Sequence, residues 1–158
     1  MRLFGLAALA LVCACSGSPA GATVGKVAPD WTLPTANGGH LALASYRGKA
    51  VYLNFFATWC PPCNAEAPDV NALARRYASR GLRVIGIDEQ ESAQKAQGFV
   101  KKFGLVYPAV IDEGSLGEQY KVNGLPVHVF IKQDGTIAMI RAGEMTKAEI
   151  ESEIRAIL

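Results

Sequence analysis

The sequence has few cysteines, no strong excess of charge of either sign and no apolar run long enough to cross a bilayer. Lysine and arginine together number 16 against 14 aspartate and glutamate residues, so the formal net charge is only +2. Such a balance gives no reason to expect nucleic acid as a partner, because nucleic acid attracts concentrated positive charge. The sequence also lacks an internal repeat and a phosphate-binding glycine loop. Its 158 residues predict one domain that is large enough to bury a core.

The four cysteines form two pairs that occur in different contexts. Cys13 and Cys15 lie in an N-terminal stretch, whereas Cys60 and Cys63 lie in the body of the chain. A single pair in the domain excludes a framework of structural disulfides. It also argues against a structural zinc site, which takes four ligands, because no second pair follows. The second pair is therefore the feature to explain.

Residues 1–14 have the layout of a secretory signal peptide, with one basic residue before an apolar run that is too short for a stable membrane anchor. The end of this run resembles a lipobox, which predicts cleavage before Cys15 and lipidation of its sulfur. An ordinary signal-peptidase site at 20–22 is the alternative. Residues 15–25 are small and polar and predict a flexible tether. We therefore expect residues 26–158 to form an exported domain on the periplasmic side of the cell envelope, anchored to a membrane through Cys15.

The chain is organised around an apolar strand pattern that leads into a Cys-Pro-Pro-Cys sequence. Val51–Phe56 predicts a buried strand, and a helical pattern begins just after Cys60. Unpaired N–H groups and the macrodipole at a helix start favour an anion, so a lowered pKa makes Cys60 the predicted nucleophile. Cys63, one turn into the helix and expected to be less exposed, is the predicted resolving thiol.

Two prolines separate these cysteines and bear on the direction of the redox reaction. Pro61 and Pro62 suit the first helical turn, where backbone N–H groups have no intrahelical partner. They remove two donors and add no positive charge, so we expect only moderate stabilisation of the Cys60 thiolate. This favours a reduction potential nearer to that of thioredoxin, about −270 mV, than to that of DsbA, about −120 mV. The sequence therefore predicts a reductant.

The segment Asn54–Cys63, with Trp59 directly before the first cysteine, resembles the active-site segment of the TlpA/ResA-like membrane-associated thioredoxins. The resemblance spans roughly residues 27–158 and implies an α/β protein of thioredoxin fold, with a central mixed β-sheet flanked by helices. It also implies an N-terminal β-hairpin, which 27–33 and 40–43 would form, and a helix–strand insertion at about 91–111. The implied activity is thiol–disulfide exchange without a cofactor, with Trp59 contacting the substrate.

The sequence Gly124-Leu125-Pro126 opens a later strand pattern. In thioredoxin-fold proteins a Gly-X-Pro at this place carries a cis peptide bond, and its proline packs beside the two sulfurs. The resemblance therefore implies that Pro126 is cis and that Leu125 pairs with the backbone of the bound substrate. His128, two residues on, is predicted to be a packed or edge histidine.

A proton acceptor for Cys63 must also be identified. Cytoplasmic thioredoxins have a buried aspartate six residues before the first cysteine, where this chain has Asn54, which cannot titrate and reads as a core amide. Glu66 lies three residues after Cys63 on the same helix, so the two side chains are neighbours. A carboxylate there, partly removed from water, could accept the thiol proton. A solvent-facing charge is the alternative interpretation of Glu66.

Other chemistries for the cysteine pair are weaker. Asn64 stands where a Cys-X-X-Cys-His haem attachment motif has its histidine. A peroxiredoxin motif has threonine three residues before its cysteine, whereas Thr58 is two before Cys60. A copper-binding or delivery module, which would be expected to add a nearby histidine or methionine, remains the alternative from another class. No metal ligand set is predicted.

The expected partners follow from a reductant outside the cytoplasm. Its clients would be exported proteins with disulfides, for example in cytochrome c maturation or metalloprotein assembly, and a membrane thiol donor would supply electrons. We expect a monomer. The last helix is predicted at 146–158, with a capping box between Thr146 and Glu149.

Overall fold

A computed structural model describes residues 21–158. The predicted signal peptide at 1–14 and the predicted lipidation of Cys15 lie outside this range. Residues 21–25, which belong to the predicted tether, lie against the domain. The Ala22 N–H donates to the Gln119 carbonyl at 2.8 Å, and the Gly25 N–H donates to the Ile137 carbonyl at 2.9 Å. The packed chain therefore begins before residue 26.

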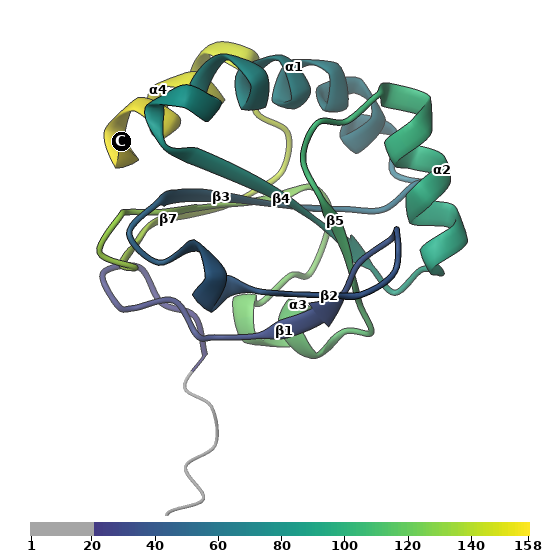
Figure 1. The fold of residues 1–158 in the computed structure, drawn as a ribbon, viewed down its shortest axis with the longest axis horizontal. Helices are drawn as coiled ribbons and strands as arrows, with labels where there is room; N and C mark the ends of the chain where they lie inside the picture. The colour runs from purple at the N-terminus through teal and green to yellow at the C-terminus, as the bar shows by residue number, and fades with distance from the viewer. Residues whose placement is uncertain (1–20) are drawn as a thin grey trace, which may run out of the picture.

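A mixed five-stranded sheet forms the centre of the molecule, in the order β5-β4-β3-β6-β7 (Figure 1). β3 pairs in parallel with β4 and antiparallel with β6. All residues of β3 are buried, which explains why this stretch is apolar throughout rather than alternating. The strands are β3 (Ala50–Phe56), β4 (Leu82–Glu89), β5 (Ala109–Asp112), β6 (Val127–Ile131) and β7 (Ile137–Ala142).

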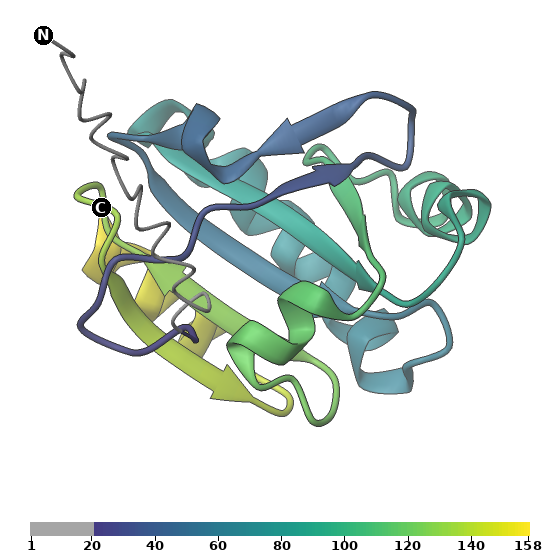
Figure 2. The same cartoon turned by 90° about the horizontal axis from the view of Figure 1, so that it is seen from below.

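Helices cover one face of the sheet, and a hairpin with a short helix covers the other (Figures 1 and 2). The first face carries α1 (Pro61–Tyr77), α2 (Ala93–Phe103) and α4 (Lys147–Ile157). The second carries β1 (Thr32–Pro34), β2 (His40–Ala42) and α3 (Ser115–Tyr120). Short 3-10 helices span Leu43–Tyr46 and Ala78–Arg80. Within residues 21–158 no helix has both the length and the apolar character needed to cross a membrane.

The predicted hairpin is present, but its strands are shorter than expected. Each has three residues, whereas the hairpin was expected to use 27–33 and 40–43. The start of the first segment is used elsewhere, because the Ala28 N–H donates to the Gly135 carbonyl at 2.9 Å. This contact joins the chain to the β6–β7 turn and takes it away from the hairpin partner.

The predicted helix–strand insertion is confirmed as α2 and β5, which pairs in parallel with β4 at the sheet edge. The helix begins at Ala93 rather than near Glu91, because Ser92 is its N-cap and accepts from the Lys95 N–H at 3.4 Å. The last helix has the predicted capping box of Thr146 with Glu149. Local sequence signals therefore locate these elements to within a few residues.

Candidate active site

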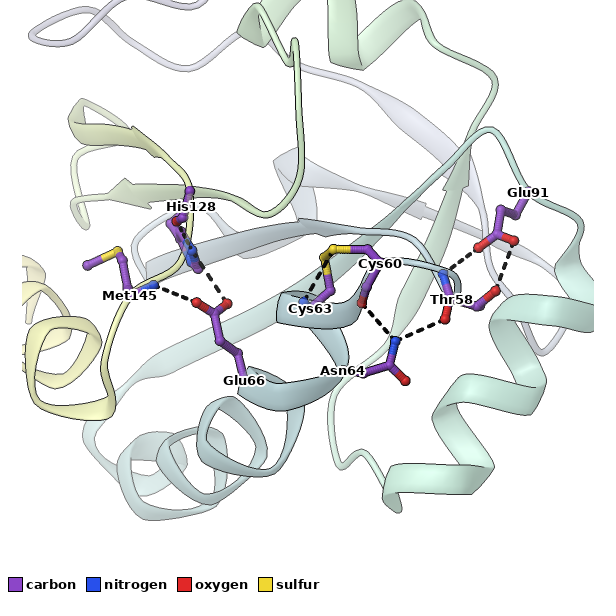
Figure 3. The surroundings of a disulfide bond; sticks show 9 residues. Thr58, Cys60, Cys63, Asn64, Glu66, Glu91, His128 and Met145 are labelled. Carbon is purple, nitrogen blue, oxygen red and sulfur yellow. Dashed lines mark hydrogen bonds and ion pairs between the residues drawn. A yellow bond between two sulfur atoms is a disulfide. The ribbon is translucent and has the colours of Figure 1, made fainter.

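Cys60 and Cys63 form a disulfide across the first turn of α1, with their Cα atoms 5.3 Å apart (Figure 3). Cys60 is the N-cap, as predicted, and its sulfur accepts from the Cys63 N–H at 3.3 Å. Pro61 and Pro62 occupy the two intervening positions and have no N–H to offer. After reduction, the Cys63 N–H and the helix macrodipole can therefore stabilise a Cys60 thiolate.

The expectation that Cys63 is less exposed than Cys60 is wrong. Their exposed fractions are 4% and 2%, because the disulfide draws both sulfurs into one apolar cluster that also contains Phe56. The N-cap position, and not solvent access in the oxidised state, therefore distinguishes the two sulfurs. Trp59, directly before the pair, is 68% exposed and open to a partner.

The Leu125-Pro126 peptide bond is cis, as the resemblance implied. Leu125 packs against the apolar cluster that contains Cys60 and Cys63. The fold thus brings a segment more than 60 residues away in the sequence to the disulfide. Substrate contact by Trp59, Leu125 and Pro126 remains a prediction.

Two polar side chains hold the turn between β3 and α1, on the side of the disulfide opposite Glu66 in Figure 3. The backbone N–H and the hydroxyl of Thr58 donate to the Glu91 carboxylate at 2.5 and 2.9 Å. The Asn64 amide donates to the carbonyls of Thr58 and Cys60 at 2.9 and 2.8 Å. Burial acts to raise the pKa of Glu91, but the hydrogen bonds from Thr58 and the Lys95 ammonium together lower it.

Sequence reasoning missed this support. Asn64 was considered only as evidence against haem attachment and copper delivery, and Glu91 only as the start of a helix. Of the two contacts, that of Asn64 was easier to predict from sequence, because an asparagine amide in the first helical turn commonly bonds to nearby carbonyls. Nothing in the sequence links Glu91 to Thr58, since 33 residues separate them.

Glu66 is 6% exposed, so its interpretation as a solvent-facing charge is wrong. Its Oε1 accepts from the Met145 N–H at 2.5 Å. Burial raises the pKa of Glu66 to about 7; the Met145 hydrogen bond opposes this shift and the Glu144 carboxylate adds to it. A carboxyl with this pKa, one turn from Cys63, is suited to exchange a proton near neutral pH.

His128 is fully buried, as a packed histidine should be, but it also belongs to a polar chain that sequence reasoning missed. Its Nδ1 lies 2.8 Å from the Tyr52 hydroxyl, its Nε2 lies 3.1 Å from the Gly143 carbonyl oxygen, and the same Nε2 is 3.6 Å from Glu66 Oε2. Burial lowers the pKa of His128 to about 4, so the ring is neutral at pH 7 and its approach to Glu66 is not an ion pair.

Strand alternation could have indicated this arrangement. Asn54 pairs with His128 across β3 and β6. Because every second side chain of a strand lies on the same face, Tyr52 and Asn54 of β3 share the face covered by α1 with His128 of β6. Asn54 itself is 8% exposed, which agrees with its predicted core position. The sequence alone does not set this register.

Residues 24–140 match the AhpC/TSA family. This chain belongs to the AhpC/TSA family. It is 37% identical over 135 residues to the thiol-disulfide oxidoreductase ResA of Geobacillus kaustophilus, covering 85% of this chain and 78% of that protein. It is 35% identical to ResA of Bacillus anthracis, again with 85% of this chain and 78% of that protein covered.

Solved structures agree with this family assignment. A secreted Mycobacterium tuberculosis disulfide oxidoreductase homologous to Escherichia coli DsbE has a TM-score of 0.73 and 31% identity, with 80% of this chain and 95% of that chain covered. A thiol:disulfide interchange protein of the thioredoxin family from Chlorobium tepidum has a TM-score of 0.76 and 28% identity, covering 90% of this chain and 99% of that chain.

The predicted thioredoxin fold is thereby confirmed, with its mixed sheet between helices. The predicted enzyme class is confirmed as well, because this chain is a thiol–disulfide oxidoreductase whose cysteine pair forms a disulfide. Within residues 21–158, no group of three or more histidine, cysteine, aspartate or glutamate side chains is arranged to hold a metal.

Proposed function

We propose that this oxidoreductase works as a reductant of disulfides in exported proteins. The observation that carries the proposal is the N-cap geometry of Cys60. Its sulfur has the Cys63 N–H as a donor, while Pro61 and Pro62 offer none and add no charge. A thiolate stabilised only moderately leaves the dithiol able to give up electrons, whereas strong stabilisation would favour the reduced form.

The reaction consumes one dithiol and one client disulfide. The Cys60 thiolate attacks a sulfur of the client, the client disulfide breaks, and the released client thiolate takes up a proton. Glu66 accepts the proton of Cys63, whose thiolate then attacks Cys60. The second client thiolate leaves and is protonated. The client disulfide has then gained two electrons and two protons as two thiols, and the enzyme pair is left oxidised as the Cys60–Cys63 disulfide.

The client would bind across the exposed Trp59 and beside the cis Pro126, whose neighbour Leu125 lies in the cysteine cluster. The predicted leader and Cys15 support a location at the periplasmic side of the envelope, held by a lipid anchor. Restoring the dithiol in an oxidising compartment requires a membrane thiol donor. Proteins that mature with haem or another metal on reduced cysteines are clients of the expected kind.

Trapping tests this function directly. Cys63→Ala should accumulate mixed disulfides through Cys60, because the adduct cannot be resolved. These are measured as reducible high-mass species in envelope fractions and identified by mass spectrometry. The Cys60→Ala/Cys63→Ala double variant is the matched control and should trap nothing. An absence of trapped partners, together with a reduced wild-type protein that leaves insulin disulfides intact, would overturn the proposal.

A further inference from the structure

The two oxygens of Glu66 have different surroundings. Oε1 is engaged by the Met145 N–H. Oε2 is buried, and among residues 21–158 it has no hydrogen-bond partner. A buried oxygen without a partner is costly once the carboxyl is ionised. The His128 ring lies next to it, with Nε2 at 3.6 Å, and Figure 3 shows the Glu66 carboxylate directed toward this ring and toward Met145.

The surroundings of His128 select one tautomer. Nε2 must carry the proton, because it faces the Gly143 carbonyl oxygen at 3.1 Å, where two acceptors would repel each other. Nδ1 then accepts from the Tyr52 hydroxyl at 2.8 Å. Both ring nitrogens are satisfied in the neutral form, and Nε2 lies 3.1 Å from the Gly143 oxygen and 3.6 Å from Glu66 Oε2.

We propose that His128 is a positioning residue for the proton transfer between Cys63 and Glu66, a role that rests on the proposed function. At 3.6 Å its Nε2–H is too far from Oε2 for a hydrogen bond, and the Gly143 carbonyl engages it. An ionised carboxylate attracts this N–H, and an approach of a few tenths of an ångström makes a charge-assisted bond. The donor therefore stabilises the ionised form of Glu66, which is the form that accepts the Cys63 proton.

Other charged groups around the pair do not replace this donor. Glu144 acts on Glu66 with like charge. Arg141 acts against protonation of His128 and is paired with Glu149 at 3.1 Å. Further groups that titrate on these elements include Cys63 and Asp69 on α1, the latter paired with Lys147 of α4 at 3.0 Å. On β3, burial raises the pKa of Tyr52, and Tyr107 and Glu66 both add to this shift. His128 is thus the neutral donor that the fold presents to Oε2.

Two substitutions in the full-length chain separate a positioning role from a packing role. His128→Leu removes the donor, whereas His128→Gln keeps an N–H near the position of Nε2. Carbon-13 NMR of the Glu66 carboxyl in the oxidised protein should show titration about one pH unit higher in His128→Leu than in wild type. His128→Gln should titrate close to wild type. At pH 7 the resolving step of His128→Leu should slow several-fold and recover at higher pH.

Val129→Ala is the matched control, because Val129 is the next residue, fully buried and packed in the cluster on the opposite face of the sheet. Val129→Ala should lower stability without shifting the Glu66 titration or the pH dependence of the resolving step. The role of His128 is overturned if His128→Leu titrates like wild type or if Val129→Ala shifts Glu66 equally. A wild-type protein without Cys60-dependent disulfide reduction would instead overturn the proposed function.

A measurement on the wild-type protein covers the case in which His128→Leu does not fold. Nitrogen-15 NMR should show the neutral Nε2–H tautomer of His128 at pH 7. The Nε2 proton should move downfield as Glu66 ionises, with the same midpoint as the carboxyl carbon. The proposal would be ruled out by an Nδ1–H tautomer, or by an Nε2 proton whose chemical shift does not change as Glu66 titrates.

Discussion

At the residue scale, the pKa of Glu66 results from opposing effects of burial and hydrogen bonding. Burial disfavours the carboxylate and raises the pKa to about 7, although the Met145 N–H stabilises the charged form. Asn54 is also buried but cannot titrate. In the proposed mechanism, proton exchange therefore rests on a carboxyl from helix α1, and not on a carboxyl from strand β3.

Glu66→Gln tests this assignment, because it keeps the size of the side chain and removes its basicity. The resolving step at pH 7 to 8 should slow by about tenfold or more and lose its dependence on a group titrating near 7. The measurement is the pH–rate profile for release of a trapped mixed disulfide. Asp69→Asn on the same helix, where Asp69 pairs with Lys147, should leave the profile unchanged. An unaltered profile for Glu66→Gln would return Glu66 to a purely structural role.

At the scale of elements, the active-site turn depends on a contact between two segments that adjoin different strands. Thr58 follows β3, and Glu91 follows β4, the parallel neighbour of β3. Because parallel strands end at the same edge of a sheet, the two residues meet there and Glu91 receives both donors of Thr58. The start of α1, and with it Cys60, is held by this contact.

Glu91→Ala should therefore lower the free energy of unfolding by about 2 kcal/mol, because it leaves the part-buried Thr58 N–H and hydroxyl without their acceptor. Urea unfolding of the oxidised protein at pH 7 measures this loss. Glu153→Ala on α4 removes the same charge from a partly exposed helical position and should change stability by less than about 0.5 kcal/mol. Equal effects of the two variants would contradict the importance of the Thr58 contact.

At the scale of the whole molecule, three carboxyls of the described chain are buried with unusually high pKa values. Besides Glu66 these are Asp88 and Glu89 at the end of β4. Burial raises the pKa of each to about 7, with Glu91 adding to the shift at Asp88 and Asp112 adding to it at Glu89. Within residues 21–158 neither oxygen of Asp88 has a hydrogen-bond partner. Folding therefore disfavours ionisation at these sites.

The stability of the oxidised protein should consequently fall as the pH rises from 5 to 7. In this range the native state keeps protons that the unfolded chain, with ordinary carboxyl pKa values near 4, has already lost. His128, whose pKa is lowered to about 4, makes the folded state more stable as the pH rises from about 4 to about 6.5. This single group opposes the three carboxyls and offsets only part of their effect. We expect a net loss on the order of 2 kcal/mol, measured by urea midpoints at pH 5, 6, 7 and 8.

Asp88→Asn is the matched variant for this pH effect. It should be more stable than wild type at pH 8, where the native protein must bury a charge, and should differ little at pH 5, where Asp88 keeps its proton. The slope of stability against pH should flatten accordingly. A wild-type protein whose stability rises from pH 5 to 8 would contradict the buried-carboxyl account.

Much of the fold and part of the site could be predicted from local sequence. The apolar run before Cys60, the prolines after it and the capping box at Thr146 act within one strand or one helical turn, so their structural consequences are contained in the residues themselves. The cis bond at Pro126 was predicted through the resemblance. The relative exposure of the two cysteines was predicted wrongly, because it depends on side chains packed from several elements.

What the sequence by itself determined is the chemistry available: a single dithiol in the domain at a helix start, prolines that limit its stabilisation, and a carboxyl one turn further along. Only the tertiary structure decided how this chemistry is supported. It buried Glu66, placed His128 and Tyr52 in a polar chain beside it, and brought Glu91 to the turn at Thr58. The physical reason is that desolvation and hydrogen-bond partners come from residues distant in the chain, whose approach depends on strand register and helix packing.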